Sequence, residues 1–187
     1  MKLKHPVLPA LLILALTACS TNSLEQYAGR QPAFSMADYF DGRLTAHGVV
    51  RDRGGDVTRT FTAELQGSWD DAGIGSLREL FVFSDGEVQA RTWTFRPRTD
   101  GGYDATAGDV VGIGRIDTRG NAMHLDYTLT IQYRDRDLDI AVDDWMWRID
   151  EDTVINHSVL RKWGFRVGTL QLAIVRQQTP CQVNCPR

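Results

Sequence analysis

From about residue 42 onward, apolar and polar residues alternate along the chain, and this period of two constrains the fold more than any other feature. The run from Met123 to Tyr133 shows it most clearly, because every second residue is apolar. Such alternation gives a β-strand one apolar and one polar face. Breaks rich in glycine and aspartate recur about every ten residues, a spacing typical of sandwiches and barrels. The chain is therefore predicted to be all-β.

One β-domain is expected over residues 34–178, built from about nine antiparallel strands. The expected strands are residues 44–50, 57–65, 77–83, 88–95, 103–116 (as one strand or two), 123–133, 138–149, 153–160 and 165–175. Asp85-Gly86 marks a tight hairpin between the third and fourth strands. This number of strands is enough to close an up-and-down barrel of the lipocalin or calycin type, whose interior can admit one apolar ligand.

The start of the chain has the pattern of a bacterial lipoprotein signal. Lys2 and Lys4 precede a short apolar run that ends at Leu16-Thr17-Ala18-Cys19. A basic start, an apolar stretch too short to span a bilayer and small residues before the cut are what secretory processing recognises. We expect residues 1–18 to be removed and Cys19 to be acylated, anchoring the protein to a membrane. The alternatives are a plain signal peptide with an incidental Cys19, or an uncleaved anchor helix.

Residues 19–33 are mostly polar and are interpreted as a tether between the lipid and the folded domain. Ser20, directly after the lipidated position, favours the outer membrane over the inner one, so the expected location is the periplasmic face of the cell envelope. After the tether, Ser35-Met36-Ala37-Asp38 has the pattern of a helix-capping box and predicts one short helix.

Cys181 and Cys185 lie close together in the C-terminal tail, residues 179–187. In an oxidising periplasm such a pair is expected to form a small disulfide. A redox or metal-binding pair is the alternative, but no second cysteine pair or nearby histidine completes a zinc set. No metal and no cofactor are therefore expected.

The charge balance argues against a nucleic-acid partner. Removing residues 1–18 takes away two lysines and no acid, which changes the formal charge from -3 to -5. Nucleic-acid binding relies on a strong basic field to pair with phosphates, which this chain lacks.

The segment Asp143-Asp144-Trp145-Met146-Trp147 is the most site-like in the sequence. Its apolar parity changes across Asp143-Asp144, since Leu138, Ile140 and Val142 precede the pair and Trp145 and Trp147 follow it. A β-bulge there would return all of them to one face and could re-aim the two carboxylates. The alternative is a structural kink with solvated acids and core tryptophans.

Three histidines, His47, His124 and His157, are candidate general bases or metal ligands. His47 and His124 occupy the polar faces of their strands, so exposure to solvent is the simpler interpretation. If the polar faces lined the interior instead, His124 and Asp126 would become candidate site residues. No serine triad surrounds these histidines, and no catalytic residue is assigned.

Several motifs together resemble one family of bacterial lipoproteins of unknown function, DUF3833. They are Tyr39-Phe40-Asp41-Gly42, Asp85-Gly86 ahead of Arg91-Thr92-Trp93, Gly120-Asn121-Ala122, Asp143-Asp144-Trp145-Met146 and the closing strand Gly164–Val175. The resemblance covers nearly the whole mature domain. It implies a lipocalin-like fold and a role related to membrane lipids, because members tend to be encoded beside enzymes that modify fatty acids in those lipids. It implies no catalytic residues.

The leading hypothesis is a lipid-anchored barrel that binds a fatty acid, a lipid or another apolar small molecule. The residues expected to contact this ligand are Trp93, Phe95, Tyr127, Trp145, Trp147, Asp143, Asp144 and His124. A second hypothesis is a lipid-modifying enzyme that uses Asp143, Asp144, His124 or His157 for acid–base chemistry. A third is a structural or assembly lipoprotein with no ligand, whose barrel is filled by its own side chains.

Overall fold

The structure of the protein is a computed structural model that describes residues 23–134 and 136–177. The signal peptide, Cys19 and the cysteine pair of the tail lie outside the described residues, so their processing, acylation and disulfide remain predictions. Between residues 23 and 177, leaving out residue 135, no helix is long and apolar enough to cross a membrane.

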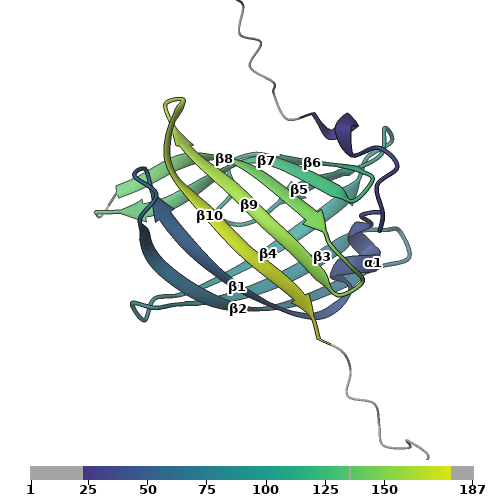
Figure 1. Cartoon of the computed structure of the whole chain (residues 1–187), viewed down its shortest axis with the longest axis horizontal. Coiled ribbons are helices and arrows are strands. Elements are labelled where there is room, and N and C mark those ends of the chain that lie inside the picture. The colour runs from purple at the N-terminus through teal and green to yellow at the C-terminus, as the bar shows by residue number, and fades with distance from the viewer. Residues whose placement is uncertain (1–22, 135, 178–187) are drawn as a thin grey trace, which may run out of the picture.

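Ten antiparallel strands follow one another around a closed barrel (Figure 1). They are β1 (Gly42–Asp52), β2 (Val57–Trp69), β3 (Gly75–Phe83), β4 (Val88–Pro97), β5 (Tyr103–Thr106), β6 (Gly114–Arg119), β7 (Ala122–Tyr133), β8 (Arg136–Arg148), β9 (Thr153–Lys162) and β10 (Phe165–Arg176). The barrel closes because β1 pairs with β10 from Leu44↔Arg176 to Asp52↔Gly168. The predicted all-β, up-and-down barrel is confirmed. There is one strand more than nine because the stretch expected over residues 103–116 is divided between β5 and the start of β6.

A short helix, α1 (Met36–Phe40), plugs one end of the barrel, at the right in Figure 1. The predicted cap is present, since the Asp38 amide donates to the Ser35 hydroxyl at 3.3 Å. Met36, Tyr39 and Phe40 are buried in the barrel end. The Tyr39 hydroxyl also donates to the Ile174 carbonyl at 2.8 Å, which ties the plug to β10.

The interior of the barrel is the apolar core predicted from the alternation. Inward positions of nine strands contribute to it together with the plug. Its strand members include Leu44, Ala46, Leu65, Leu77, Trp93, Phe95, Ile116, Leu125, Val154 and Ile174, each no more than 5 % exposed. Burying this many large apolar groups is the main source of stability in such a fold.

The β-bulge expected at Asp143-Asp144 is absent. β8 pairs with β7 without a break, through Leu125↔Asp144 and His124↔Trp145, and it also pairs with β9 in regular register. Asp144 therefore points inward, while Trp145 and Trp147 point outward. Apolar residues are tolerated at these two outward positions because Tyr27 covers them, with ring centroids 6.0 and 6.3 Å away. The prediction was wrong because a strand can carry apolar residues on its outer face where another segment covers it.

The segment expected to be a tether packs against the barrel instead of hanging free. The 3-10 helix η1 (Leu24–Tyr27) contacts β6 and β7. Beyond it, the Phe34 amide donates to the Gly120 carbonyl at 2.7 Å. A tether between Cys19 and the folded body is thus shorter than residues 19–33.

Candidate ligand-binding site in the barrel interior

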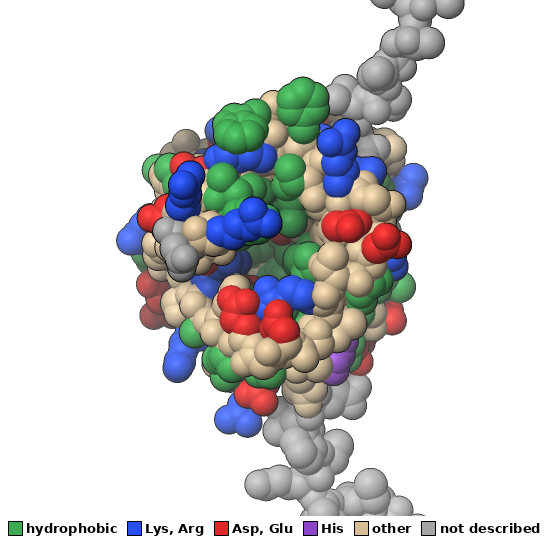
Figure 2. Space-filling view, turned by 90° about the vertical axis from the view of Figure 1, so that its left-hand side faces the viewer, with side chains coloured by type: hydrophobic (Ala, Val, Ile, Leu, Met, Phe, Trp, Pro, Cys, Tyr) green, Lys and Arg blue, Asp and Glu red, His purple; other side chains and the backbone are tan. Residues whose placement is uncertain are grey.

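An internal cavity of about 90 Å³ lies beside the α1 plug, in the middle of the barrel. Its apolar wall includes Phe40, Leu65, Trp93, Phe95 and Met123. The opposite end of the barrel, where the β1–β2, β3–β4, β7–β8 and β9–β10 hairpins meet, is hollowed (Figure 2). Hydrophobic side chains are visible inside this hollow and charged side chains around it. The barrel therefore has a closed end and an open end.

Four charged or amide side chains interrupt the apolar wall. Glu79 of β3, Arg91 of β4, Asp144 of β8 and Asn156 of β9 all line the cavity. Each occupies an inward position of its strand. Glu79, for example, lies two residues from both Leu77 and Phe81, which also face the interior. A buried charge is costly unless it is paired or hydrogen-bonded, so these groups mark the polar part of the site.

Arg91 links two carboxylates at the edge of the cavity. Its guanidinium binds Asp109, in the β5–β6 loop, through Nε at 2.9 Å and Nη2 at 2.8 Å. The Arg91 Nη1 atom lies 3.9 Å from Glu79 Oε2, which also accepts a hydrogen bond of 3.2 Å from the Trp93 indole. Such a bidentate arginine–carboxylate pair is geometrically specific, so the Arg91 side chain is held in one orientation.

Asp144 is held by two neighbours on β9. The Ser158 hydroxyl donates to Asp144 Oδ1 at 2.8 Å, and the Asn156 amide donates to the same oxygen. The Asn156 amide also donates to the Trp145 carbonyl at 3.1 Å, which fixes its orientation. These bonds leave the second carboxylate oxygen of Asp144 without a partner among the described residues.

Loss of hydration changes the acidity of the interior groups. Burial raises the pKa of Glu79 to about 7, although Arg91 opposes the shift. Burial likewise raises the pKa of Asp144 to about 6, against the hydrogen bonds from Ser158 and Asn156. The pKa of the Tyr127 hydroxyl is raised above its usual range for the same reason. At neutral pH Glu79 is thus close to half protonated, Asp144 is mostly ionised, and the Tyr127 phenol is neutral.

The residues predicted to contact a ligand divide into two groups. Trp93, Phe95, Tyr127 and Asp144 line the internal cavity. The expectation that the other four lie there too is corrected, since Trp145, Trp147, Asp143 and His124 line a groove on the outer surface. Strand parity is the reason, because without a bulge these four share the outward face.

Four polar residues of the cavity were missed by sequence reasoning: Glu79, Arg91, Asn156 and Ser158. For Glu79 and Arg91 the alternation of the chain held a signal. Glu79 interrupts the apolar parity of Leu77 and Phe81, and Arg91 shares the parity of Trp93. A polar residue at an apolar position of an alternating strand is a candidate for an inward-facing site residue.

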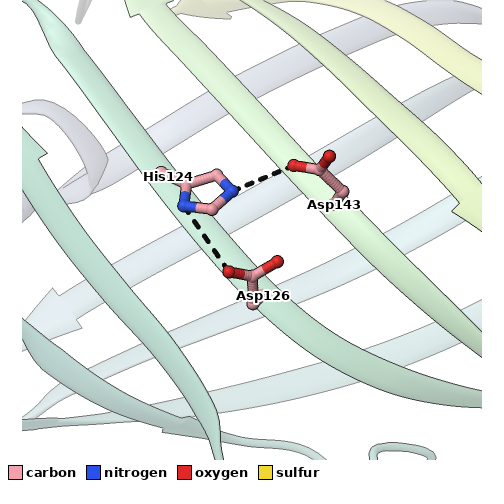
Figure 3. Close-up of side chains that lie close together, drawn as sticks. All are labelled: His124, Asp126 and Asp143. Atoms are coloured by element: carbon pink, nitrogen blue, oxygen red, sulfur yellow. Dashed lines mark hydrogen bonds and ion pairs between the residues drawn. The ribbon is translucent and has the colours of Figure 1, made fainter. Parts of the chain in front are cut away.

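On the outer surface, His124 lies between two carboxylates (Figure 3). His124 Nε2 is 2.9 Å from Asp143 Oδ1, and His124 Nδ1 is 3.6 Å from Asp126 Oδ2. The Trp145 ring stacks on the imidazole with centroids 4.3 Å apart, and its indole donates to Asp143 at 2.9 Å. Potential ligand atoms of these three polar residues lie within 4.8 Å of one another, a spacing compatible with a metal ion. The two carboxylates face opposite nitrogens of one ring, however, so the arrangement is that of a hydrogen-bonded imidazole.

The four residues considered for acid–base catalysis do not meet in one pocket. Asp144 faces the interior, whereas Asp143, His124 and His157 line the outer groove. The barrel wall separates the two sets, so Asp144 cannot share a proton with His124 directly. His47, the remaining candidate on β1, is exposed on the outside.

Two solved structures share the fold at low sequence identity. An S-type phycobiliprotein lyase from Guillardia theta aligns over 74 % of this chain and 89 % of its own, with 8 % identity and a TM-score of 0.54. A protein of unknown function from the DUF3598 family of Nostoc punctiforme aligns over 79 % of this chain and 51 % of its own, with 18 % identity and a TM-score of 0.53. Both similarities concern the barrel and confirm the lipocalin-like architecture.

No curated protein matches the chain. One family model does, over residues 13–176, a span that contains the plug and every strand of the barrel. The chain therefore belongs to DUF3833, a family of proteins of unknown function.

Proposed function

We propose that this protein is a lipid-anchored envelope protein whose barrel binds an apolar or amphipathic small molecule, such as a fatty acid or another lipid. One observation carries the proposal. The barrel is plugged at one end and hollowed at the other, and its interior combines aromatic and aliphatic walls with a few inward polar groups. Sites for small molecules are built in this way, with apolar surface for affinity and polar groups for orientation.

The size of the cavity limits how such a ligand is bound. A volume of about 90 Å³ is well below the roughly 300–1,000 Å³ of typical ligand pockets. A long acyl chain thus has to displace side chains or extend toward the hollowed end. Met36, Met123 and Met146 line the cavity, and methionine is the apolar side chain best able to adapt its shape.

The proposed location rests on the N-terminal sequence, where the lipoprotein pattern ends at Cys19. Anchoring at the periplasmic face of the outer membrane would keep the barrel beside a source of lipids, which agrees with a role in membrane lipid modification or homeostasis. The Guillardia protein is a phycobiliprotein lyase. At 8 % identity its likeness concerns the fold, so the ligand class of this chain is argued from its own cavity.

The same small volume favours a second candidate, a structural or assembly lipoprotein whose barrel stays filled by its own side chains. Binding decides between the two. The plug and all ten strands lie within residues 36–176, so a chain that begins at residue 20 retains the folded unit without the lipidated cysteine.

The test is native mass spectrometry of this chain with saturated fatty acids, alcohols and amines of eight to eighteen carbons. The expected result is a one-to-one complex with at least one class. Ala46→Leu, which adds bulk at an inward position that lines the cavity, should weaken the complex at least tenfold. Ala90→Leu, on an exposed position of β4, is the matched control and should leave it unchanged. A folded chain that binds none of these compounds would favour the structural candidate instead.

A further inference from the structure

Three polar atoms around the cavity lack partners. The second carboxylate oxygen of Glu79, the second carboxylate oxygen of Asp144 and the Tyr127 hydroxyl receive or donate no hydrogen bond within residues 23–134 and 136–177. Asp144 is 6 % exposed, and the Glu79 side chain is 12 % exposed. All three side chains line the cavity, so the unpartnered atoms indicate a place where a ligand group could form hydrogen bonds.

The charge around this place is unbalanced toward acid. Arg91 is the one cationic side chain among the described residues that line the cavity, and both Glu79 and Asp144 line it as well. The guanidinium is already engaged in the bidentate pair with Asp109. A carboxylate entering here would meet two carboxyl groups and a cation that is already neutralised, and like charges at short range in a poorly hydrated interior repel strongly.

A hydroxyl or amine would meet the opposite situation. Both carboxyl groups offer an acceptor oxygen to an entering N–H or O–H, and the phenol of Tyr127 can accept or donate in turn. A carboxylate–ammonium hydrogen bond is also charge-assisted, which makes it stronger than a neutral one.

We infer that Glu79, Asp144 and Tyr127 form a head-group pocket for an alkyl ligand that carries a hydrogen-bond donor, a hydroxyl or an amine, and that a carboxylate head group is excluded from it. This inference rests on the proposed ligand-binding function and narrows it. The alkyl part would extend from the head-group pocket past Phe81 and Leu172 of the cavity wall toward the hollowed end.

The experiment compares three ligands of one chain length, dodecan-1-ol, dodecylamine and dodecanoate, by native mass spectrometry and calorimetric titration of the chain from residue 20. The alcohol and the amine should bind at least tenfold more tightly than the carboxylate. Glu79→Gln and Asp144→Asn should each weaken amine binding at least tenfold and leave dodecanoate binding unchanged or improved.

Asp143→Asn is the matched control, because it removes the neighbouring carboxylate on the outer face of the same strand. It should leave all three affinities unchanged. Near-ultraviolet circular dichroism establishes that each variant is folded, and Glu79→Gln alone suffices if Asp144→Asn does not fold.

The outcomes separate the two proposals. Equal or tighter binding of dodecanoate, or an amine affinity that neither inward substitution changes, would overturn the head-group inference while leaving ligand binding intact. Failure of all three compounds to bind a folded chain would overturn the head-group inference, whereas the proposed ligand binding is overturned only if the whole panel of eight to eighteen carbons also fails to bind.

Discussion

At the scale of single residues, the barrel keeps two carboxyl groups in an interior that favours their protonated form. Burial raises the pKa of Glu79 to about 7 and that of Asp144 to about 6, above the ordinary values of 4.5 and 3.8. The folded state therefore binds protons more tightly than the unfolded chain. The resulting stabilisation is fully present below about pH 4 and is lost as the pH rises through 6 and 7.

This linkage predicts that the free energy of unfolding falls between about pH 4 and pH 7. The loss is on the order of 3 kcal/mol for each group if its whole shift is realised. Glu79→Gln keeps an acceptor for the Trp93 indole but cannot ionise, so this variant should lose markedly less stability over the same range. Urea unfolding at several pH values measures the effect.

Glu64→Gln serves as the control, since Glu64 lies on the outward face of β2. Its pH profile should follow that of the unchanged chain. Surface carboxyls such as Asp100, whose pKa is lowered chiefly by the hydrogen bond from Arg98, act in the opposite direction at lower pH and do not obscure this window. Identical slopes for Glu79→Gln and the unchanged chain would contradict the prediction.

At the scale of elements, the close packing of α1 against β2 requires a glycine at position 67. A Cβ atom at Gly67 of β2 would lie 1.9 Å from the Phe40 carbonyl oxygen at the end of α1. Gly67→Ala should therefore displace α1 and lower the free energy of unfolding by about 1–3 kcal/mol, the usual range for overpacking. Thermal unfolding measures this loss.

Gly108→Ala is the matched control, because no atom lies within 4 Å of a Cβ at that position. This substitution should be neutral or slightly stabilising, since alanine restricts the unfolded chain. If both variants unfolded at the same temperature, close approach of the plug would not be what requires glycine at position 67.

The β9–β10 hairpin contains a residue that its turn does not favour. Lys162 pairs with Phe165, which leaves Trp163 and Gly164 as a two-residue loop with φ of 51° and 81°. Positive φ at both central residues is the type I′ geometry, which favours Asn-Gly. Trp163 is 85 % exposed, so it makes few packing contacts that would compensate for its unfavourable backbone conformation.

Trp163→Asn should thus raise the free energy of unfolding by about 1 kcal/mol, the order of the penalty for a left-handed bulky residue. Trp163→Phe should give no such gain, because phenylalanine is equally unsuited to this conformation. Chemical denaturation of the two variants distinguishes a stability gain from better turn geometry from one caused by loss of the indole. A Trp163→Asn variant less stable than the unchanged chain would refute the argument.

At the scale of the whole molecule, the proposed lipid anchor at Cys19 lies before the packed N-terminal segment and outside the closed barrel. We expect Cys19→Ala in the full chain to abolish acylation, because the thiol is the attachment point. Metabolic labelling with an alkyne fatty acid followed by membrane fractionation should show loss of both label and membrane association.

Cys181→Ala removes a cysteine of the tail and should keep the label. Equal labelling of the two variants would exclude Cys19 as the lipidated residue. The experiment is independent of the barrel interior, so it tests location separately from ligand binding.

Local sequence periodicity was sufficient to predict the strands, the capped helix and the class of fold. It was also sufficient to place Trp93, Phe95 and Tyr127 inward, because alternation is a property of each strand by itself. These features depend on contacts between residues close together in the chain or on the simple division between inside and outside.

Only the tertiary structure showed whether the other candidate residues lie on the inner or the outer face of the barrel. Tyr27 covers the outward-facing Trp145 and Trp147, although it lies more than one hundred residues earlier in the chain. The hydrophobicity of the two tryptophans therefore carried no information about the interior. Glu79 and Asp144 converge on one cavity only after β3 and β8 are brought together by closure. Closure joins residues that are distant in sequence, and the alternation within one strand cannot encode which distant residues will meet.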